Sequence, residues 1–426
     1  MPTLARPFRA LRPRPERAAD VIAPPYDVVS TDEARALAAG RPASFLHISR
    51  PEIDLPPGTS PYSDDAYSRG AANLDRLVRD GVLARDAEPS FYVYRIEMQG
   101  HAQTGVAIAA SVAAYDANRI RRHELTRPDK ENDRVRNIDS LNAQTGPVLL
   151  AFRANARLGA LVRDAAGARP LFSARGPNDT EHTVWRIAER ERVAAFAAAL
   201  DALDALYIAD GHHRAAAASR VARARRERAS AEAGAATRGS AARATLDASH
   251  EYFLAVAFPH DEMRILDYNR VVRDLNGLTP DTLVARVRES FDVEPSDEPV
   301  KPAQPETFGL LVAGRWYRFA VRPSLVPRGD PVASLDVSLL QDRVLAPILG
   351  IGDPRTDARV DFVGGVRGLD ELERRVASGR AAAAFALHPT RMEQLMAVAN
   401  ANRLMPPKST WFEPKLGDGL LSHVLD

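Results

Sequence analysis

The most constraining feature of the sequence is a short apolar run that ends in an acid, a glycine and two histidines. Leu206-Tyr-Ile-Ala209 has the composition of a buried strand, and it continues into Asp210-Gly-His-His-Arg214 and an Ala- and Arg-rich helical stretch. Glycine allows the chain to turn sharply from strand to helix at Gly211. The first amides of such a helix lack intrahelical partners and favour a bound anion. The sequence thus predicts an anion site; the alternative is an Asp-Gly turn with surface histidines.

The residue types at this corner suit a phosphate group. Arg214 can offer two parallel donors, and His212 and His213 add hydrogen bonds or charge. Neighbouring side chains diverge in a helix or a strand, so the two histidines are poor ligands for one zinc ion. A Mg²⁺ ion carried by a phosphate donor needs only one or two protein carboxylates. We therefore expect Asp210 to bind Mg²⁺ or to orient a histidine.

Short apolar strands and helices alternate along the chain, which predicts an α+β fold with mixed sheets. The periodicity places helices and strands as follows. Helices are expected over 62–81, 129–144, 155–166 and 189–200, and strands over 91–95, 105–109, 147–152, 181–187 and 252–258. A chain of 426 residues is longer than a single hydrophobic core usually supports, so more than one domain or lobe is expected. We expect a core with insertions over 1–270, including a mobile insertion or a frayed helix at 227–245, and a C-terminal α/β lobe over 271–426 that could pack against the core site.

Composition removes several classes of function. The chain has no cysteine, which excludes disulfides, thiolate nucleophiles, Cys-ligated zinc and iron–sulfur clusters. Lys+Arg 57 against Asp+Glu 56 leaves a net charge of +1, which argues against nucleic acid as a partner. The N-terminus lacks the apolar segment of a signal peptide, and no run of about 18 apolar residues could span a membrane. We expect a cytoplasmic protein with no membrane partner.

A second motif, His123-Glu-Leu-Thr-Arg-Pro-Asp-Lys130, concentrates acids, bases and cations. Glu124 could take a proton from a hydroxyl, with His123 beside it, and Arg127 or Lys130 could neutralise a phosphate in transfer. The residues alone favour a solvated charged loop before a helix.

A third motif near the C-terminus, Pro406-Pro-Lys-Ser-Thr410, is followed by Pro414-Lys415. The two prolines stiffen the backbone, so Lys408, Ser409 and Thr410 are held at little entropic cost and suit a phosphate. The glycine pattern of a Walker A loop is missing. The alternative is a rigid turn that ties the tail to the core.

A fourth motif, Pro24-Pro-Tyr-Asp27, forms a rigid turn that could present Tyr26 and Asp27 to a pocket. His47 lies in a nearby segment, Ser44-Phe-Leu-His47, that resembles a strand and could face either way. The residues alone favour a structural role for this region.

These motifs together resemble a known family, the bacterial domain-of-unknown-function family 1015. The resemblance rests on P-P-Y-D-V, S-F-L-H-I-S-R-P-E, H-E-L-T-R-P-D-K, A-D-G-H-H-R and M-P-P-K-S-T-W-F-E-P-K-L, and it extends from about residue 5 to the C-terminus. The D-G-H-H-R core also resembles the signature of ParB/sulfiredoxin-like proteins, in particular the free serine kinases, which phosphorylate L-serine to O-phosphoserine. The resemblance implies a ParB/sulfiredoxin-like core with additional lobes.

The resemblance also implies a set of site residues. Asp210, Gly211, His212, His213 and Arg214 would form the phosphate and metal site, and Glu124 would be the base with His123 beside it. We add Lys408, Ser409 and Thr410 as phosphate ligands, His213 as a catalytic candidate, and Tyr26, Asp27, His47 and Arg127 as substrate-binding candidates.

The expected activity is phosphoryl transfer to a small hydroxylated amino acid, most simply serine. ATP, ADP or pyrophosphate would be the donor, with Mg²⁺ as cofactor. Two alternatives stay open: a nucleotide-binding switch protein without metabolite kinase activity, and a phosphate-ester hydrolase.

Overall fold

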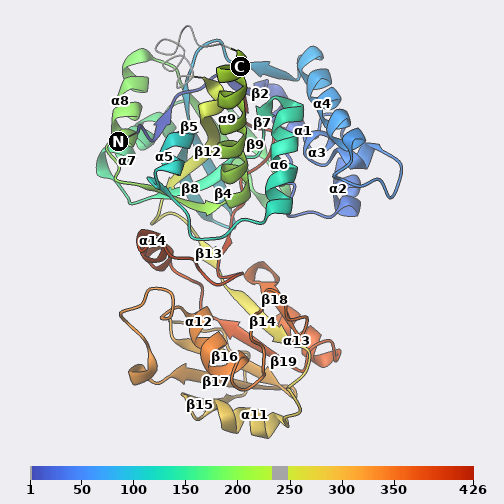
Figure 1. The fold of residues 1–426 in the computed structure, drawn as a ribbon, viewed down its shortest axis with the longest axis vertical. Helices are drawn as coiled ribbons and strands as arrows, with labels where there is room; N and C mark the ends of the chain where they lie inside the picture. Colours follow the sequence, from blue (N-terminus) through green and yellow to red (C-terminus); the bar gives the residue numbers. More distant parts are fainter. Residues whose placement is uncertain (1, 233–247) are drawn as a thin grey trace. The chain divides into compact units, whose positions relative to one another are not determined.

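The computed structural model describes residues 2–232 and 248–426, and the chain forms two compact units (Figure 1). The first unit comprises Met1–Met263 together with Pro414–Asp426, and the second comprises Arg264–Glu413. The expected boundary between residues 270 and 271 therefore falls inside a strand of the second unit. The expected C-terminal lobe also loses its last segment, because the chain returns to the first unit at Pro414.

A nine-stranded mixed sheet forms the centre of the first unit. Its strands run in the order β6-β11-β8-β12-β5-β4-β10-β9, and β1 pairs with β5. They are β1 (Ala5–Arg6), β4 (Phe91–Met98), β5 (His101–Ser111), β6 (Ile120–Arg121), β8 (Val148–Phe152), β9 (Phe172–Arg175), β10 (Glu181–Ile187), β11 (Leu206–Asp210) and β12 (Tyr252–Pro259). The β11–β6 and β12–β8 pairs are parallel and the other pairs are antiparallel.

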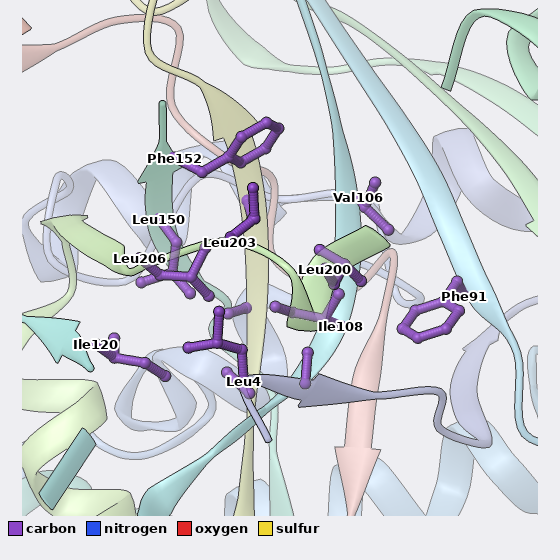
Figure 2. Close-up of a cluster of buried hydrophobic side chains, with 14 of the residues drawn as sticks. Leu4, Phe91, Val106, Ile108, Ile120, Leu150, Phe152, Leu200, Leu203 and Leu206 are labelled. Atoms are coloured by element: carbon purple, nitrogen blue, oxygen red, sulfur yellow. The ribbon is translucent and has the colours of Figure 1, made fainter. Parts of the chain in front are cut away.

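Helices pack against one face of this sheet, toward which alternate residues of its strands point. On β12, Phe253, Ala255 and Ala257 share a core cluster with Leu200 of a helix and with Leu150. Figure 2 shows this cluster. The helices of the unit are α1 (Ala18–Val21), α2 (Thr31–Ala38), α3 (Leu46–Ser49), α4 (Asp64–Arg79), α5 (Val112–Asp116), α6 (Pro128–Leu141), α7 (Ala156–Ala166), α8 (Arg190–Asp201) and α9 (His212–Glu232).

A small second sheet brings the two ends of the chain together. Its order is β3-β2-β21-β7, formed by β2 (Ala10–Pro13), β3 (Leu83–Arg85), β7 (Ala143–Gln144) and β21 (Ser422–Val424). Helices α6 and α9 pack against each other through Ile138, Ala217 and Val221, with Leu425 of the C-terminus in the same cluster. The start of α9 and the C-terminal segment therefore belong to one packed region.

The second unit is built on a six-stranded antiparallel sheet in the order β15-β17-β16-β19-β14-β18. Its elements are β13 (Ile265–Leu266), β14 (Tyr268–Val272), α11 (Pro280–Val287), β15 (Phe291–Ser296), β16 (Thr307–Val312), β17 (Arg315–Val321), α12 (Asp336–Leu340), β18 (Val360–Gly364), α13 (Asp370–Ala377), β19 (Ala383–Leu387), α14 (Met392–Asn400) and β20 (Trp411–Phe412). Its core includes Trp316 and Leu372.

The α+β prediction is confirmed, and so are most of the expected elements. The hairpin of β4 and β5 closes at Gln99 and Gly100, which both have positive φ, 52° and 76°. The first part of the segment 227–245, residues 227–232, is the end of helix α9, as the helical alternative predicts. The rest of it, from residue 233, lies outside the described residues. Within the described ranges, no helix has the length and apolar character needed to cross a membrane.

Candidate functional site

The predicted strand–turn–helix corner is present at the end of β11. The strand ends at Asp210, Gly211 has φ +95°, and α9 begins at His212. This φ lies in the region that favours glycine. A Cβ at Gly211 would lie 3.0 Å from Nε and 3.1 Å from Cζ of Arg214, so the guanidinium folds back over the turn. The backbone therefore favours glycine at this position, and a larger residue would also press on the Arg214 guanidinium.

The Arg214 side chain is held by two acceptors and is only 10% exposed. It donates to the backbone carbonyl of Pro147 and, at 3.1 Å, to Oδ2 of Asp210. The Nζ of Lys415 lies 4.0 Å from the same Oδ2. Burial alone would raise the pKa of Asp210, but Lys415 and Arg214 hold it below its ordinary value. Asp210 is therefore a carboxylate that two cations share.

The His123–Lys130 loop reaches this corner. The rings of His123 and His212 pack edge to face with their centroids 4.6 Å apart. Oε2 of Glu124 lies 3.6 Å from Nδ1 of His212, and the Arg127 amide donates to Nε2 of His213 at 3.0 Å. The glutamate candidate and the D-G-H-H-R segment, which are far apart in sequence, thus share one site.

Both buried histidines are neutral near pH 7. Burial lowers the pKa of His123 to about 4 and the pKa of His212 well below its ordinary value. Among the described residues, Nδ1 of His123 and Nε2 of His212 are buried with no hydrogen-bond partner. His212 therefore lacks the positive charge that the sequence also allowed.

A small cavity with both polar and apolar lining residues lies beside Arg214, with a volume of about 30 Å³, room for a few water molecules. Tyr26 and Asp418 line it, and so do Arg134 and Ser49, whose buried Oγ has no partner among the described residues. Burial raises the pKa of Asp418 to about 7 and that of Tyr26 to about 12. The Arg134 guanidinium stacks 3.8 Å from the centre of the Tyr26 ring.

Three residues of this region, Ser49, Arg134 and Asp418, were not predicted from the sequence, and Lys415 was noted there without a role. Arg134 and Ser49 carry no local signal, because only the fold brings α3 and α6 beside Arg214. The Pro414-Lys415 pair was visible, but its place in the first unit depends on the return of the chain at Pro414.

Asp27 and His47 are two further substrate-binding candidates, and they have different surroundings. Asp27 is exposed, and its charge acts on Arg214 and Asp418. His47 lies in helix α3, not in a strand, and bonds Asp54 at 2.7 Å and the Arg41 carbonyl at 3.2 Å. It does not line the cavity.

Arg127 contacts the site through its backbone amide, and burial together with the Arg127 charge lowers the pKa of His213. Its guanidinium is exposed and pairs with Asp129 at 2.9 Å, while its amide bonds His213. The backbone contact therefore orients His213, while the Arg127 guanidinium itself is exposed.

Lys408, Ser409 and Thr410 belong to the second unit. Ser409 donates to the Pro406 carbonyl at 2.6 Å, and Arg270 donates to the Lys408 carbonyl at 3.1 Å. These contacts close the rigid turn that the prolines predicted. A role for the three residues as phosphate ligands stays a prediction.

The acids of the described region fit a metal ion poorly. No group of three or more His, Cys, Asp or Glu side chains is arranged to hold one within residues 2–232 and 248–426. The Oδ2 atom of Asp210 already faces Arg214 and Lys415, whose positive charges would repel a divalent cation. The expected Mg²⁺ ligand role of Asp210 thus gains no support from its contacts.

Comparison with solved structures gives distant likenesses. A free serine kinase in complex with AMP is 14% identical, with 72% of this chain and 86% of that chain covered and a TM-score of 0.33. A conserved hypothetical protein from Pyrococcus furiosus is 13% identical, with 74% and 94% covered and a TM-score of 0.34. SbnI from Staphylococcus aureus is 10% identical, with 73% and 85% covered and a TM-score of 0.35.

Sequence comparison is more decisive. No curated protein matches the chain. A family profile does match, over residues 5–338, and this range includes the Pro24–Asp27 turn, the His123–Lys130 loop and the corner at Gly211. The chain belongs to the DUF1015 family, described as proteins of unknown function.

Proposed function

We propose that this protein is a phosphotransferase that moves a phosphoryl group from a nucleotide or pyrophosphate to the hydroxyl of a small amino acid, L-serine first. The observation that carries the proposal is the 3.6 Å approach of Glu124 Oε2 to His212 Nδ1 at the Gly211 corner. It brings a candidate base to a helix N-terminus that carries a buried arginine. These are the two parts that phosphoryl transfer to a hydroxyl requires.

In the proposed reaction the Glu124 carboxylate accepts the proton of the acceptor hydroxyl. The hydroxyl oxygen forms a bond to phosphorus as the bond from phosphorus to the leaving oxygen breaks. ADP, AMP or orthophosphate leaves, according to whether ATP, ADP or pyrophosphate is the donor. The first amides of α9 and Arg214 face the donor phosphates and stabilise the charge on the transferring group.

The choice of serine rests on the resemblance of the D-G-H-H-R and H-E motifs to those of free serine kinases. Tyr26, Asp27 and the neutral His213 are the proposed contacts on the acceptor side. Mg²⁺ arriving with the donor would neutralise phosphate charge. Since Asp210 fits it poorly, no step is assigned to it.

The test is incubation of the full chain with ATP, ADP or pyrophosphate, with and without Mg²⁺, and a panel of hydroxylated and non-hydroxylated amino acids, followed by ³¹P NMR. A new phosphomonoester that needs both donor and hydroxyl is the expected result. Donor loss without that product would instead favour a hydrolase, and tight donor binding without turnover would favour a nucleotide-binding switch.

A further inference from the structure

The C-terminal segment is anchored in the first unit immediately beside the corner. Ala23 and Asp418 exchange two backbone hydrogen bonds, at 3.1 and 2.9 Å. The Gly417 amide donates to the Tyr94 hydroxyl at 3.4 Å, and a Cβ at Gly417 would lie 3.0 Å from Ile22 side-chain atoms. This close packing fixes the backbone two residues after Lys415. The fold therefore determines the position of the Lys415 backbone beside the corner.

Lys415 adds positive charge where the donor phosphates are proposed to bind. Arg214 and Lys415 carry two positive charges against the single negative charge of Asp210, and His212 is neutral. Asp27 and Asp418 also act on Arg214, and Glu124 lies 3.6 Å from His212. Asp27 and Glu124 are exposed, so water and salt screen their charges, and Asp418 is partly protonated near pH 7. The inner part of the corner therefore keeps an excess of positive charge.

The geometry of Lys415 also suits a ligand. Its side chain is 22% exposed, compared with 10% for Arg214, so it lies closer to solvent. At 4.0 Å, Nζ is attracted by Asp210 Oδ2 without a hydrogen bond to it. The flexible stem of a lysine can turn its ammonium toward a phosphate oxygen.

We propose that Lys415 is a phosphate-binding residue of this site. The segment Pro414–Asp426, which follows the second unit in the sequence, thereby completes the site of the first unit. The ligand class is a diphosphate group, free or in a nucleotide. This proposal rests on the proposed function, because that function identifies the phosphate donor that Lys415 would bind. It assigns a residue beyond the family profile, which ends at residue 338.

The test is calorimetric binding of pyrophosphate and of ADP to the full chain, with no acceptor present. The chain has only four lysines, Lys130, Lys301, Lys408 and Lys415, which gives a matched series. We expect Lys415→Met to weaken both ligands by about tenfold or more, as the loss of a charged hydrogen bond predicts. Lys415→Arg should recover most of the affinity, and Lys301→Met, an exposed site in the second unit, should bind as the parent does.

The outcomes separate this inference from the proposed function. If no acceptor is phosphorylated but pyrophosphate binding depends on Lys415, the function fails and the inference stands. Pyrophosphate and ADP affinities within about twofold of the parent in a folded Lys415→Met variant would overturn the inference, and so would a parent chain that binds neither probe. If Lys415→Met does not fold, Lys415→Gln and Lys415→Arg decide in the same way. A loss in Lys408→Met with none in Lys415→Met would transfer the role to Lys408.

Discussion

The imidazole rings of His123 and His212 meet edge to face at 88°, and each buries one ring nitrogen that has no hydrogen-bond partner among the described residues. An unpaired buried nitrogen is costly, and it becomes far more costly when the ring is charged. The pair is therefore held neutral. It supports the start of α9 by packing, and it leaves Nδ1 of His212 facing Glu124.

The first prediction concerns acid stability. His123 has a pKa of about 4 in the folded chain against an ordinary value of about 6.5, so the unfolded chain binds more protons between these values. The stability of the parent thus falls as the pH drops from 6.5 toward 4. In His123→Gln this contribution is absent, so the Tm of the variant minus that of the parent should rise as the pH falls. Thermal melts at pH 7.5 and 4.5 measure it, and a constant difference would contradict it.

The second prediction has the opposite sign. Burial raises the pKa of Asp418 to about 7, so between about 4 and 7 the folded chain holds a proton that the unfolded chain has lost. The stability of the parent falls as the pH rises through this range. Asp418→Asn keeps an oxygen acceptor and removes the charge, so its Tm should gain on that of the parent between pH 4 and 8. If the Tm of Asp418→Asn instead falls relative to that of the parent as the pH rises, Asp418 is not a buried carboxyl that holds a proton.

The third prediction tests the base. Glu124→Gln should lower kcat for phosphoryl transfer by about 10²–10⁴-fold, because the amide cannot accept the hydroxyl proton. Donor affinity should change little. Glu97→Gln is the control, since its side chain is 43% exposed against 54% for Glu124 and it lies on strand β4, paired with Arg95. Steady-state kinetics with ³¹P detection separate the two variants, and full turnover in Glu124→Gln would remove Glu124 from this role.

The strand–turn–helix corner at Gly211 could be predicted from the sequence because its signal is local. An apolar run, a glycine and a helix-forming stretch lie within a few residues, so Gly211 and the start of α9 could be placed without the rest of the fold. The meeting of Glu124 with His212 was not local, and only the family resemblance suggested it. Lys415 and Asp418 depend on the return of the chain to the first unit, a contact between distant segments that no periodicity encodes. The expected strand at His47 failed because contacts to Asp54 and Arg41 stabilise a short helix there.

The last prediction separates backbone strain from the close approach of Arg214. Gly211 has φ +95° and would bring a Cβ to 3.0 Å from the guanidinium, whereas Gly58 has φ +86° with open space around it. Alanine at either position costs about 1–2 kcal/mol of stability from the left-handed backbone. Only Gly211→Ala should also displace Arg214 and weaken pyrophosphate binding, by about tenfold or more if Arg214 holds the phosphate. Denaturation and calorimetry on both variants give the two quantities, and equal pyrophosphate affinities would show that the position of the Arg214 guanidinium does not govern anion binding at this corner.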